Sequence, residues 1–219
     1  PKTGEILAMV GSVDYWDKEN DGNVNVCAAD PGRQPGSSFK PFSYLTLFSQ
    51  GTYNAASMMM DVRQSFPDDP NPPYVPENYD REYHGPIAAR QALACSYNVA
   101  ATRVIADVSV DAVLERLRAA GFRSLMRDAR HYGASLTLGG ADTTLLELTG
   151  AYRVFARGGM SSAASAIAGV RDIYGRDMTV RSGGTSRRVF GEPTTYVIGS
   201  ILSDNNARQA AFSLLSPLN

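Results

Sequence analysis

The chain has 219 residues, of which 43% are hydrophobic and 20% are charged, and its formal net charge is −1. This size and composition predict one hydrophobic core and a single domain. A charge so close to zero gives no reason to expect a nucleic acid or an anionic membrane surface as a partner. No apolar run approaches the roughly 18 residues that a membrane-spanning helix needs. Pro1 opens directly on strand-like sequence without a signal peptide, so we expect a piece of a longer protein.

The first third of the chain is predicted to hold two strands, a central helix and an extended loop. A buried strand is expected over Glu5–Gly11, and a short second strand over Val24–Cys27. A helix is predicted from about Ser37 to Gln50, with Gly51 as its stop. Because apolar side chains occupy most faces of this helix, we expect it at the centre of the fold. The proline-rich stretch from Phe66 to Tyr79 is predicted to be an extended surface excursion.

The remainder of the sequence is predicted to be mainly helical. Asp142 is expected to cap one of the helices, and a hairpin over Val170–Val180 is expected to turn at Gly175-Arg176. Two helices are interrupted near Ser96-Tyr97, where side chains can project into a cleft. The expected helices span residues 87–95, 98–108, 110–120, 143–157 and 193–202.

The most informative motif is Ser37-Ser-Phe-Lys40, which opens the apolar helix. Residues three apart share a helix face, so Lys40 can reach the Ser37 oxygen. A neutral lysine can take the serine proton as the oxygen attacks a carbonyl, but the ordinary pKa of lysine is about 10.4. Burial and a helix N-terminus both disfavour the charged form. A bare Ser-x-x-Lys is usually a surface lysine after an ordinary cap; here the Pro35-Gly36 turn and the aromatic helix favour catalysis.

A second motif, Ser96-Tyr97-Asn98, lies at the predicted helix break. A second serine can relay a proton from the lysine to a leaving group. An asparagine amide has donors and an acceptor, so it can hold both a lysine and a substrate amide. The alternative is structural: Ser96 or Asn98 simply starts the next helix. Taken alone, this motif is weak.

Together these residues resemble the transpeptidase domain of the penicillin-binding proteins, most closely the class A members, which also carry a glycosyltransferase domain. The resemblance covers nearly the whole chain in family order. It is carried by these segments: Pro1–Gly11, Arg33–Phe42, Tyr74–Asp80, Ala92–Ala101, Tyr132–Gly140, Leu145–Thr149 and Ile201–Asn205.

The resemblance implies a fold class, an activity and a set of roles. The fold is α+β, like that of the serine β-lactamases: an antiparallel sheet flanked by helices, with an all-helical subdomain. The activity is D,D-transpeptidation of peptidoglycan stem peptides at D-Ala-D-Ala, without a cofactor, and β-lactams acylate the same serine. Ser37 is the nucleophile and its backbone N–H an oxyanion donor, Lys40 is the base, Ser96 is the relay, and Asn98 binds the stem. The parent protein is expected to be tethered to the cytoplasmic membrane and to act outside the cytoplasm.

The sequence departs from the family pattern at its third motif. The family has a Lys-Thr-Gly strand beyond the segment around Asn205, whereas the lysines here are Lys2, Lys18 and Lys40. We therefore expect residues 1–219 to be a partial transpeptidase domain that lacks the C-terminal strands and turns over donor peptide poorly. Glu5–Gly11 would then lack its sheet partners. The literal Lys2-Thr-Gly4 reads as a turn, and the literal Ser203-Asp-Asn205 as a cap or turn after a helix.

Two other functions and a metal site are less favoured by the sequence. A class A β-lactamase needs a Glu-x-x-x-Asn loop for deacylation, but Ala151 stands four residues after Glu147. A non-catalytic β-lactam sensor would keep the fold, yet the complete set of serines, lysine and asparagine argues against it. Cys27, Cys95, His84 and His131 lack metal-ligand spacing, so no metal site is predicted. The sequence leaves open the disulfide state of the two cysteines, the acceptor amine, the oligomeric state, and whether a glycosyltransferase domain precedes Pro1.

Overall fold

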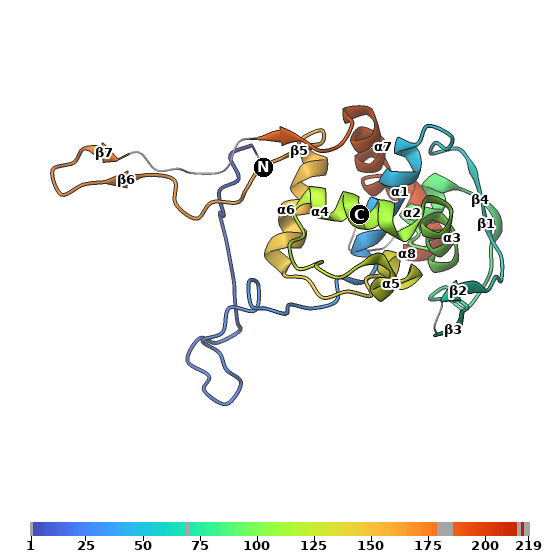
Figure 1. The fold of residues 1–219 in the computed structure, drawn as a ribbon, viewed down its shortest axis with the longest axis horizontal. Helices are drawn as coiled ribbons and strands as arrows, with labels where there is room; N and C mark the ends of the chain where they lie inside the picture. The colour runs from blue at the N-terminus through green and yellow to red at the C-terminus, as the bar shows by residue number, and fades with distance from the viewer. Residues whose placement is uncertain (1, 69–70, 179–185, 214–215, 217–219) are drawn as a thin grey trace.

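The computed structural model describes residues 2–68, 71–178, 186–213 and 216. Most helices gather into one body, on one side of the molecule in Figure 1. Their bounds are α1 Lys40–Ser49, α2 Ala89–Ala94, α3 Asn98–Val108, α4 Val110–Ala120, α5 Ala129–Tyr132, α6 Leu145–Ala156, α7 Glu192–Leu202 and α8 Asn205–Phe212.

The strands within the described residues form four separate antiparallel pairs. They are β1 Met58–Asp61 with β4 Gly85–Ala88, β2 Phe66–Asp68 with β3 Asn71–Tyr74, β5 Met160–Ser161 with β8 Arg187–Arg188, and β6 Val170–Arg171 with β7 Asp177–Met178. Helices and antiparallel strands together make the predicted α+β class. The proline-rich excursion contains the paired strands β2 and β3; residues 69–70 lie outside the described residues.

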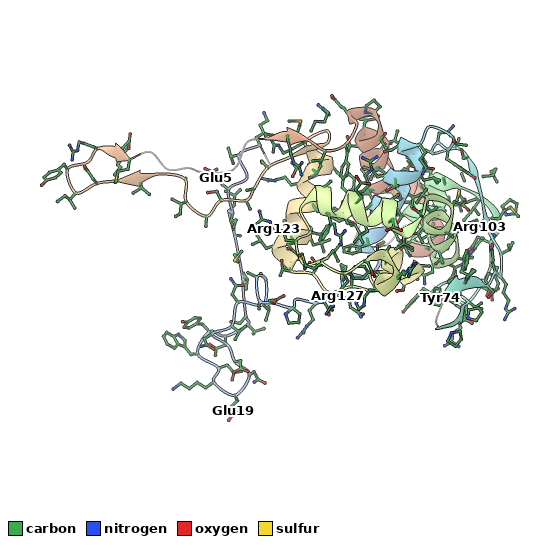
Figure 2. The ribbon with its side chains drawn as sticks, viewed as in Figure 1. Glu5, Glu19, Tyr74, Arg103, Arg123 and Arg127 are labelled. Carbon is green, nitrogen blue, oxygen red and sulfur yellow. The ribbon has the colours of Figure 1, made fainter. Side chains whose placement is uncertain are left out.

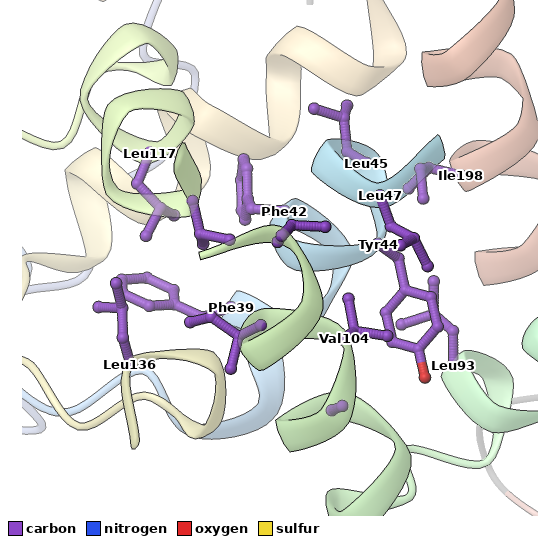
Figure 3. Packing of buried hydrophobic residues seen from close by; sticks show 14 of the residues in the cluster. Phe39, Phe42, Tyr44, Leu45, Leu47, Leu93, Val104, Leu117, Leu136 and Ile198 are labelled. Carbon is purple, nitrogen blue, oxygen red and sulfur yellow. The ribbon is translucent and has the colours of Figure 1, made fainter. Parts of the chain in front are cut away.

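Helix α1 is the centre of the fold, as its composition predicts. Every residue from Lys40 to Phe48 is buried, and α3, α4 and α7 pack around it. Figure 3 shows Phe42, Leu45 and Leu47 of this helix inside the cluster of buried side chains. Its buried hydroxyls are satisfied locally; Thr46 Oγ1, for example, donates to Phe42 O at 2.8 Å. The helix therefore holds its N-terminal turn rigidly against the core.

The predicted helices agree with the structure in the interior of the chain. Helices α3 and α4 have the bounds that their apolar periodicity predicts. Residues 87 and 88 are a correction, because they pair in β4 before α2 begins. Asp142 is a second correction: the cap of α6 is Thr144, whose hydroxyl accepts from Glu147 N. Helix α8, which follows α7 after a short turn, was not predicted.

The predicted N-terminal strand is wrong in its burial, whereas its lack of sheet partners among the described residues is what a partial domain predicts. Residues 5–11 are extended, but apart from one bridge between Glu5 and Ser165 they carry no strand pairing. Leu7 is 89% exposed. Val24–Cys27 is a run of turns rather than a strand. The N-terminal segment that contains both ranges extends away from the helices in Figure 1, and Glu19, labelled in Figure 2, lies at its far end. An extended apolar segment needs a neighbour to bury it, and the described residues supply little.

The predicted hairpin after residue 170 is confirmed. Strands β6 and β7 pair in register, and the chain turns between Asp172 and Arg176. It projects from the body on the same side as the N-terminal segment (Figure 1). Residues 179 and 180, which the prediction included, lie outside the described residues.

Candidate active site

The turn that carries Ser37 is built from glycine and proline. Gly36–Phe39 form a 3₁₀ turn that runs directly into α1, with Pro35 at its cap. Gly36 has φ +60°, a conformation that favours glycine. The backbone of Gly139 presses against it so closely that a Cβ added at Gly139 would overlap Gly36. The Pro35-Gly36 pair and the distant Gly139 therefore fix the backbone at the serine.

Phe39 anchors this turn while Ser37 faces outward. The Phe39 ring is fully buried against Phe122, with ring centroids 4.9 Å apart. Ser37 is exposed, and its Oγ has no hydrogen-bond partner among the described residues. As the second residue of a helical turn, its N–H belongs to the amides that lack an intrahelical partner. A hydroxyl without a hydrogen-bond partner among the described residues and a free amide donor thus lie together at the surface.

Lys40 lies directly beneath this turn and is only 1% exposed. Its Nζ donates to Ser96 O at 2.5 Å, Ser96 Oγ at 3.0 Å and Asn98 Oδ1 at 2.6 Å. Burial lowers the pKa of Lys40 to about 7, because the low-dielectric surroundings disfavour the ammonium form. An amine with this pKa is about half neutral near pH 7, so it can accept a proton.

Ser37 and Lys40 line one cleft of about 450 Å³ with Ser96, Tyr152 and Arg208. The sequence predicts that Lys40 can reach Ser37. Within the described residues the lysine hydrogen-bonds to the second motif instead, and no hydrogen bond joins it to Ser37. Catalytic hydrogen bonds are often loose before a substrate binds. The cleft brings together all the predicted side chains except that of Asn98, which is linked to it through Lys40.

Ser96 is held in a left-handed backbone conformation, with φ +59°. It occupies the break between α2 and α3, where the sequence predicts an interruption. Such a conformation is uncommon for a residue with a side chain and is often found at functional sites. Here it turns both the carbonyl and the hydroxyl of Ser96 toward Lys40 Nζ. When Lys40 is neutral, the Ser96 hydroxyl can donate to it, so a proton can pass between the two.

Asn98 is the first residue of α3, and its side chain has a partner on each side. Its Oδ1 accepts from Lys40, and its Nδ2 donates to Glu77 O at 2.7 Å. Asn98 does start α3, as the structural alternative expects, but its side chain bonds to Lys40 and Glu77 instead of capping the helix. The motif thus joins α1 to the loop before β4.

Three polar residues near the site were not predicted to take part in it. Tyr152 of α6 lines the cleft and donates its hydroxyl to Ser38 O at 2.9 Å. Burial raises the pKa of Tyr152 to about 12, so it stays protonated at neutral pH. Asp61 and Asn78 lie behind Asn98 in one hydrogen-bonded group. Tyr152 stands within an apolar helical pattern that predicts only core packing. The sequence marks Asn78 solely through the segment Tyr74–Asp80.

Glu147, the residue required by the β-lactamase alternative, has a structural role. Its carboxylate accepts from Arg123 N at 2.9 Å, Ser124 Oγ at 2.6 Å and Thr143 Oγ1 at 2.8 Å. Burial alone would raise the pKa of Glu147, but these hydrogen bonds together lower it. The carboxylate thus ties α6 to the loop after α4, and it is absent from the residues that line the cleft.

The two literal copies of family motifs lie outside the cleft, as the sequence order predicts. Lys2 and Thr3 are exposed in a bend that leads into the extended segment. Asp204 is the N-cap of α8 and accepts from Ala207 N, and it also pairs with Arg90 at 3.0 Å. Both copies therefore have local structural roles.

The cysteines are free thiols. Cys27 Sγ donates to Val10 O, and Cys95 Sγ donates to Ala207 O. In the described part of the chain, no group of three or more histidine, cysteine or acidic side chains is placed to hold a metal ion. No helix there is long and apolar enough to cross a bilayer.

The fold and the cleft have the features of a serine acyl-transfer protein: an exposed serine at a helix N-terminus over a buried lysine of low pKa. The family model of the penicillin-binding protein transpeptidase domain matches residues 1–196. The chain therefore belongs to the penicillin-binding protein transpeptidase family.

Relatives and solved structures agree with this assignment. Penicillin-binding protein 1A of Neisseria meningitidis is 33% identical over 212 residues, which are 93% of this chain and 25% of that protein. Penicillin-binding protein 1C of Escherichia coli is 35% identical over 154 residues, 70% of this chain and 19% of that protein. The crystal structure of penicillin-binding protein 1A from Haemophilus influenzae superposes with a TM-score of 0.74 at 25% identity, covering 83% of this chain and 31% of that one. This chain spans about a quarter of the length of the meningococcal relative.

Proposed function

We propose that this chain carries the acyl-serine centre of a D,D-transpeptidase that cross-links peptidoglycan stem peptides, and that β-lactams acylate the same serine. The observation that carries the proposal is the environment of Lys40. A buried lysine with a pKa of about 7 lies beneath an exposed serine and bonds to both polar residues of the second motif. Residues 1–219 would be part of one transpeptidase domain, in a parent protein tethered to the membrane and active outside the cytoplasm.

The first half of the reaction forms an ester on Ser37. The Ser37 oxygen attacks the carbonyl carbon of the penultimate D-alanine while neutral Lys40 takes its proton. The Ser37 N–H donates to the oxyanion that develops. Ser96 passes the proton from Lys40 to the departing nitrogen, so D-alanine leaves as a neutral amine. The Asn98 amide would hold the stem peptide alongside.

The second half transfers the acyl group. The amine of a second stem peptide attacks the ester carbonyl, and its proton returns through Ser96 and Lys40 to the Ser37 oxygen as the ester breaks. One amide bond is broken and one is formed, so no cofactor or redox partner is required. A β-lactam would open on Ser37 by the first half alone.

The test uses the protein at its natural full length with a stem pentapeptide and an acceptor amine. We expect release of D-alanine and formation of the cross-linked peptide. Ser37→Ala should abolish both, whereas Ser49→Ala, an exposed serine at the far end of α1, should change neither. A stable penicillin adduct without D-alanine release would indicate a sensor instead, and rapid nitrocefin hydrolysis would indicate a β-lactamase; either result would refute the proposal.

A further inference from the structure

Asn78, in the loop between β3 and β4, lies one shell behind the Lys40 site. Asn78 is only 3% exposed, and both polar groups of its side chain have hydrogen-bond partners. Its Oδ1 accepts from the backbone of α3, and its Nδ2 donates to Asp61 and to Glu82 O at 2.9 Å. A buried amide with every group satisfied fixes the elements that it joins.

Asn78 caps α3 in place of the helix's own residues. The N-cap residue Tyr97 makes no side-chain hydrogen bond to the first turn. Instead Asn78 Oδ1 accepts from Asn98 N at 2.8 Å and from Val99 N at 3.3 Å. First-turn amides need such an external acceptor. The position of the Asn98 backbone is therefore set by a residue 20 positions earlier in the chain.

The backbone carbonyl of Glu77, the residue before Asn78, sets the direction of the Asn98 side chain. Because Glu77 O accepts from Asn98 Nδ2, the amide oxygen is left facing Lys40 Nζ. The opposite orientation would bring two donors together at Lys40 and two acceptors together at Glu77. Residues 77 and 78 thus hold both the backbone and the side chain of Asn98.

Asp61, at the end of β1, sets the orientation of Asn78 itself. This carboxylate is 0% exposed, and its two oxygens lie 3.0 and 2.8 Å from Asn78 Nδ2. His84 contacts it through its backbone N at 2.9 Å and its ring Nδ1 at 2.6 Å. Since an ionised carboxylate can only accept, Asn78 must turn its Nδ2 toward Asp61 and its Oδ1 toward α3.

We propose that Asn78, oriented by Asp61, is a positioning residue for this site: it holds Asn98 against Lys40 and so sets the rate at which Ser37 is acylated. The inference rests on the proposed function. It assigns a task to the segment Tyr74–Asp80, which makes no hydrogen bond to Ser37 or Lys40 among the described residues.

The test exchanges the residue types at positions 61 and 78. Asn78→Asp keeps an acceptor toward α3 but sets a second carboxylate against Asp61. In the full-length protein we expect it to lower the rate of Ser37 acylation by a fluorescent penicillin roughly 10- to 100-fold, because small misplacements of a catalytic group have effects of this order. The double variant Asp61→Asn/Asn78→Asp restores a donor opposite an acceptor between positions 61 and 78, although Glu82 O still loses its donor. We expect it to recover part of the lost rate.

The controls separate positioning from folding. Thr195→Val removes a buried hydroxyl in α7 that bonds within its own helix, so it should lower thermal stability and leave the acylation rate unchanged. Should Asn78→Asp fail to fold, Asn78→Ser, too short to join Asp61 to α3 and uncharged, takes its place with a loss of at least roughly tenfold expected. A folded Asn78 variant that reacts at the wild-type rate, or an exchange that gives no recovery, would overturn the inference. Absence of labelling in the wild type would instead refute the proposed function.

Discussion

The helical body and the N-terminal segment contain the same kinds of side chain in opposite environments. Leu45 in α1 is 0% exposed, whereas Leu7 in the segment 5–11 is 89% exposed. The apolar helix α1 is surrounded by α3, α4 and α7, which bury its side chains. An extended segment must find partners for its backbone and for both faces, and here it has one bridge, to Ser165.

The side chains of the candidate site belong to the first of these two regions. The turn that carries Ser37, Lys40 and the second motif all lie in the helical body, and the packing that buries Lys40 comes from that body. The cavity of about 720 Å³ between residues 4–10 and α6 is lined mainly by apolar side chains and contains none of the predicted catalytic residues.

The largest expected effect is at the buried lysine. Lys40→Met keeps much of the volume but removes the base, so the acylation rate should fall by about 10²–10⁴. Lys18→Met, in the exposed N-terminal loop, is the matched control and should react normally. Both rates come from labelling with a fluorescent penicillin. A Lys40 variant that folds and is acylated within threefold of the wild-type rate would show that another group is the base.

A pair of leucines tests the contrast in packing. Leu45→Ala should lower the free energy of unfolding by about 2–5 kcal/mol, because it opens a cavity beside α1. Leu7→Ala should change it by less than about 0.5 kcal/mol, since that side chain is already in water. Urea denaturation of the two variants measures both values. Similar losses at the two positions would mean that the N-terminal segment is buried in solution.

The pH dependence of acylation tests the environment of Lys40. Its pKa is lowered to about 7 by burial, and only the neutral amine can take the Ser37 proton. The rate should therefore level off above about pH 8 and fall roughly tenfold per unit well below pH 7. Stopped-flow labelling between pH 5.5 and 9 gives this profile. A rate that is still rising at pH 9 would mean that Lys40 keeps its ordinary pKa.

The smallest expected effect concerns the start of α6. Thr144→Ala should cost about 1 kcal/mol of stability, because the hydroxyl accepts from Glu147 N in the first turn. Asp142→Ala should be close to neutral, since Asp142 is exposed and is not the cap. Thermal unfolding of the two variants decides between them. A larger loss of stability for Asp142→Ala than for Thr144→Ala would mean that Asp142 caps α6, as the sequence predicts.

Much of the helical body could be predicted because its signals are local. Apolar periodicity marks α3 and α4 to the residue, and the Ser37–Lys40 spacing identifies the cleft. The cap of α6 was missed by two residues, because Asp142 and Thr144 are both good capping types and only the backbone distinguishes them. The failures at Glu5–Gly11 and Val24–Cys27 arise because strand propensity depends on neighbours that a sequence pattern does not show.

The support behind the site could not be predicted for a related reason. Asn78 and Asp61 act through side-chain hydrogen bonds that join β1, the loop before β4 and α3. No periodicity records such pairs, and asparagine in a proline-rich stretch ordinarily indicates a turn. The left-handed conformation of Ser96 is likewise imposed by its surroundings rather than by residue type.

The central claim is that Ser37 is the acylated nucleophile. Its most direct test is the intact mass of the full-length protein after incubation with a penicillin, followed by mapping of the modified peptide. We expect one adduct of the penicillin mass on the peptide that contains Ser37 and Lys40, and none on Ser37→Ala. A folded protein without an adduct, or an adduct that persists in Ser37→Ala, would contradict the account.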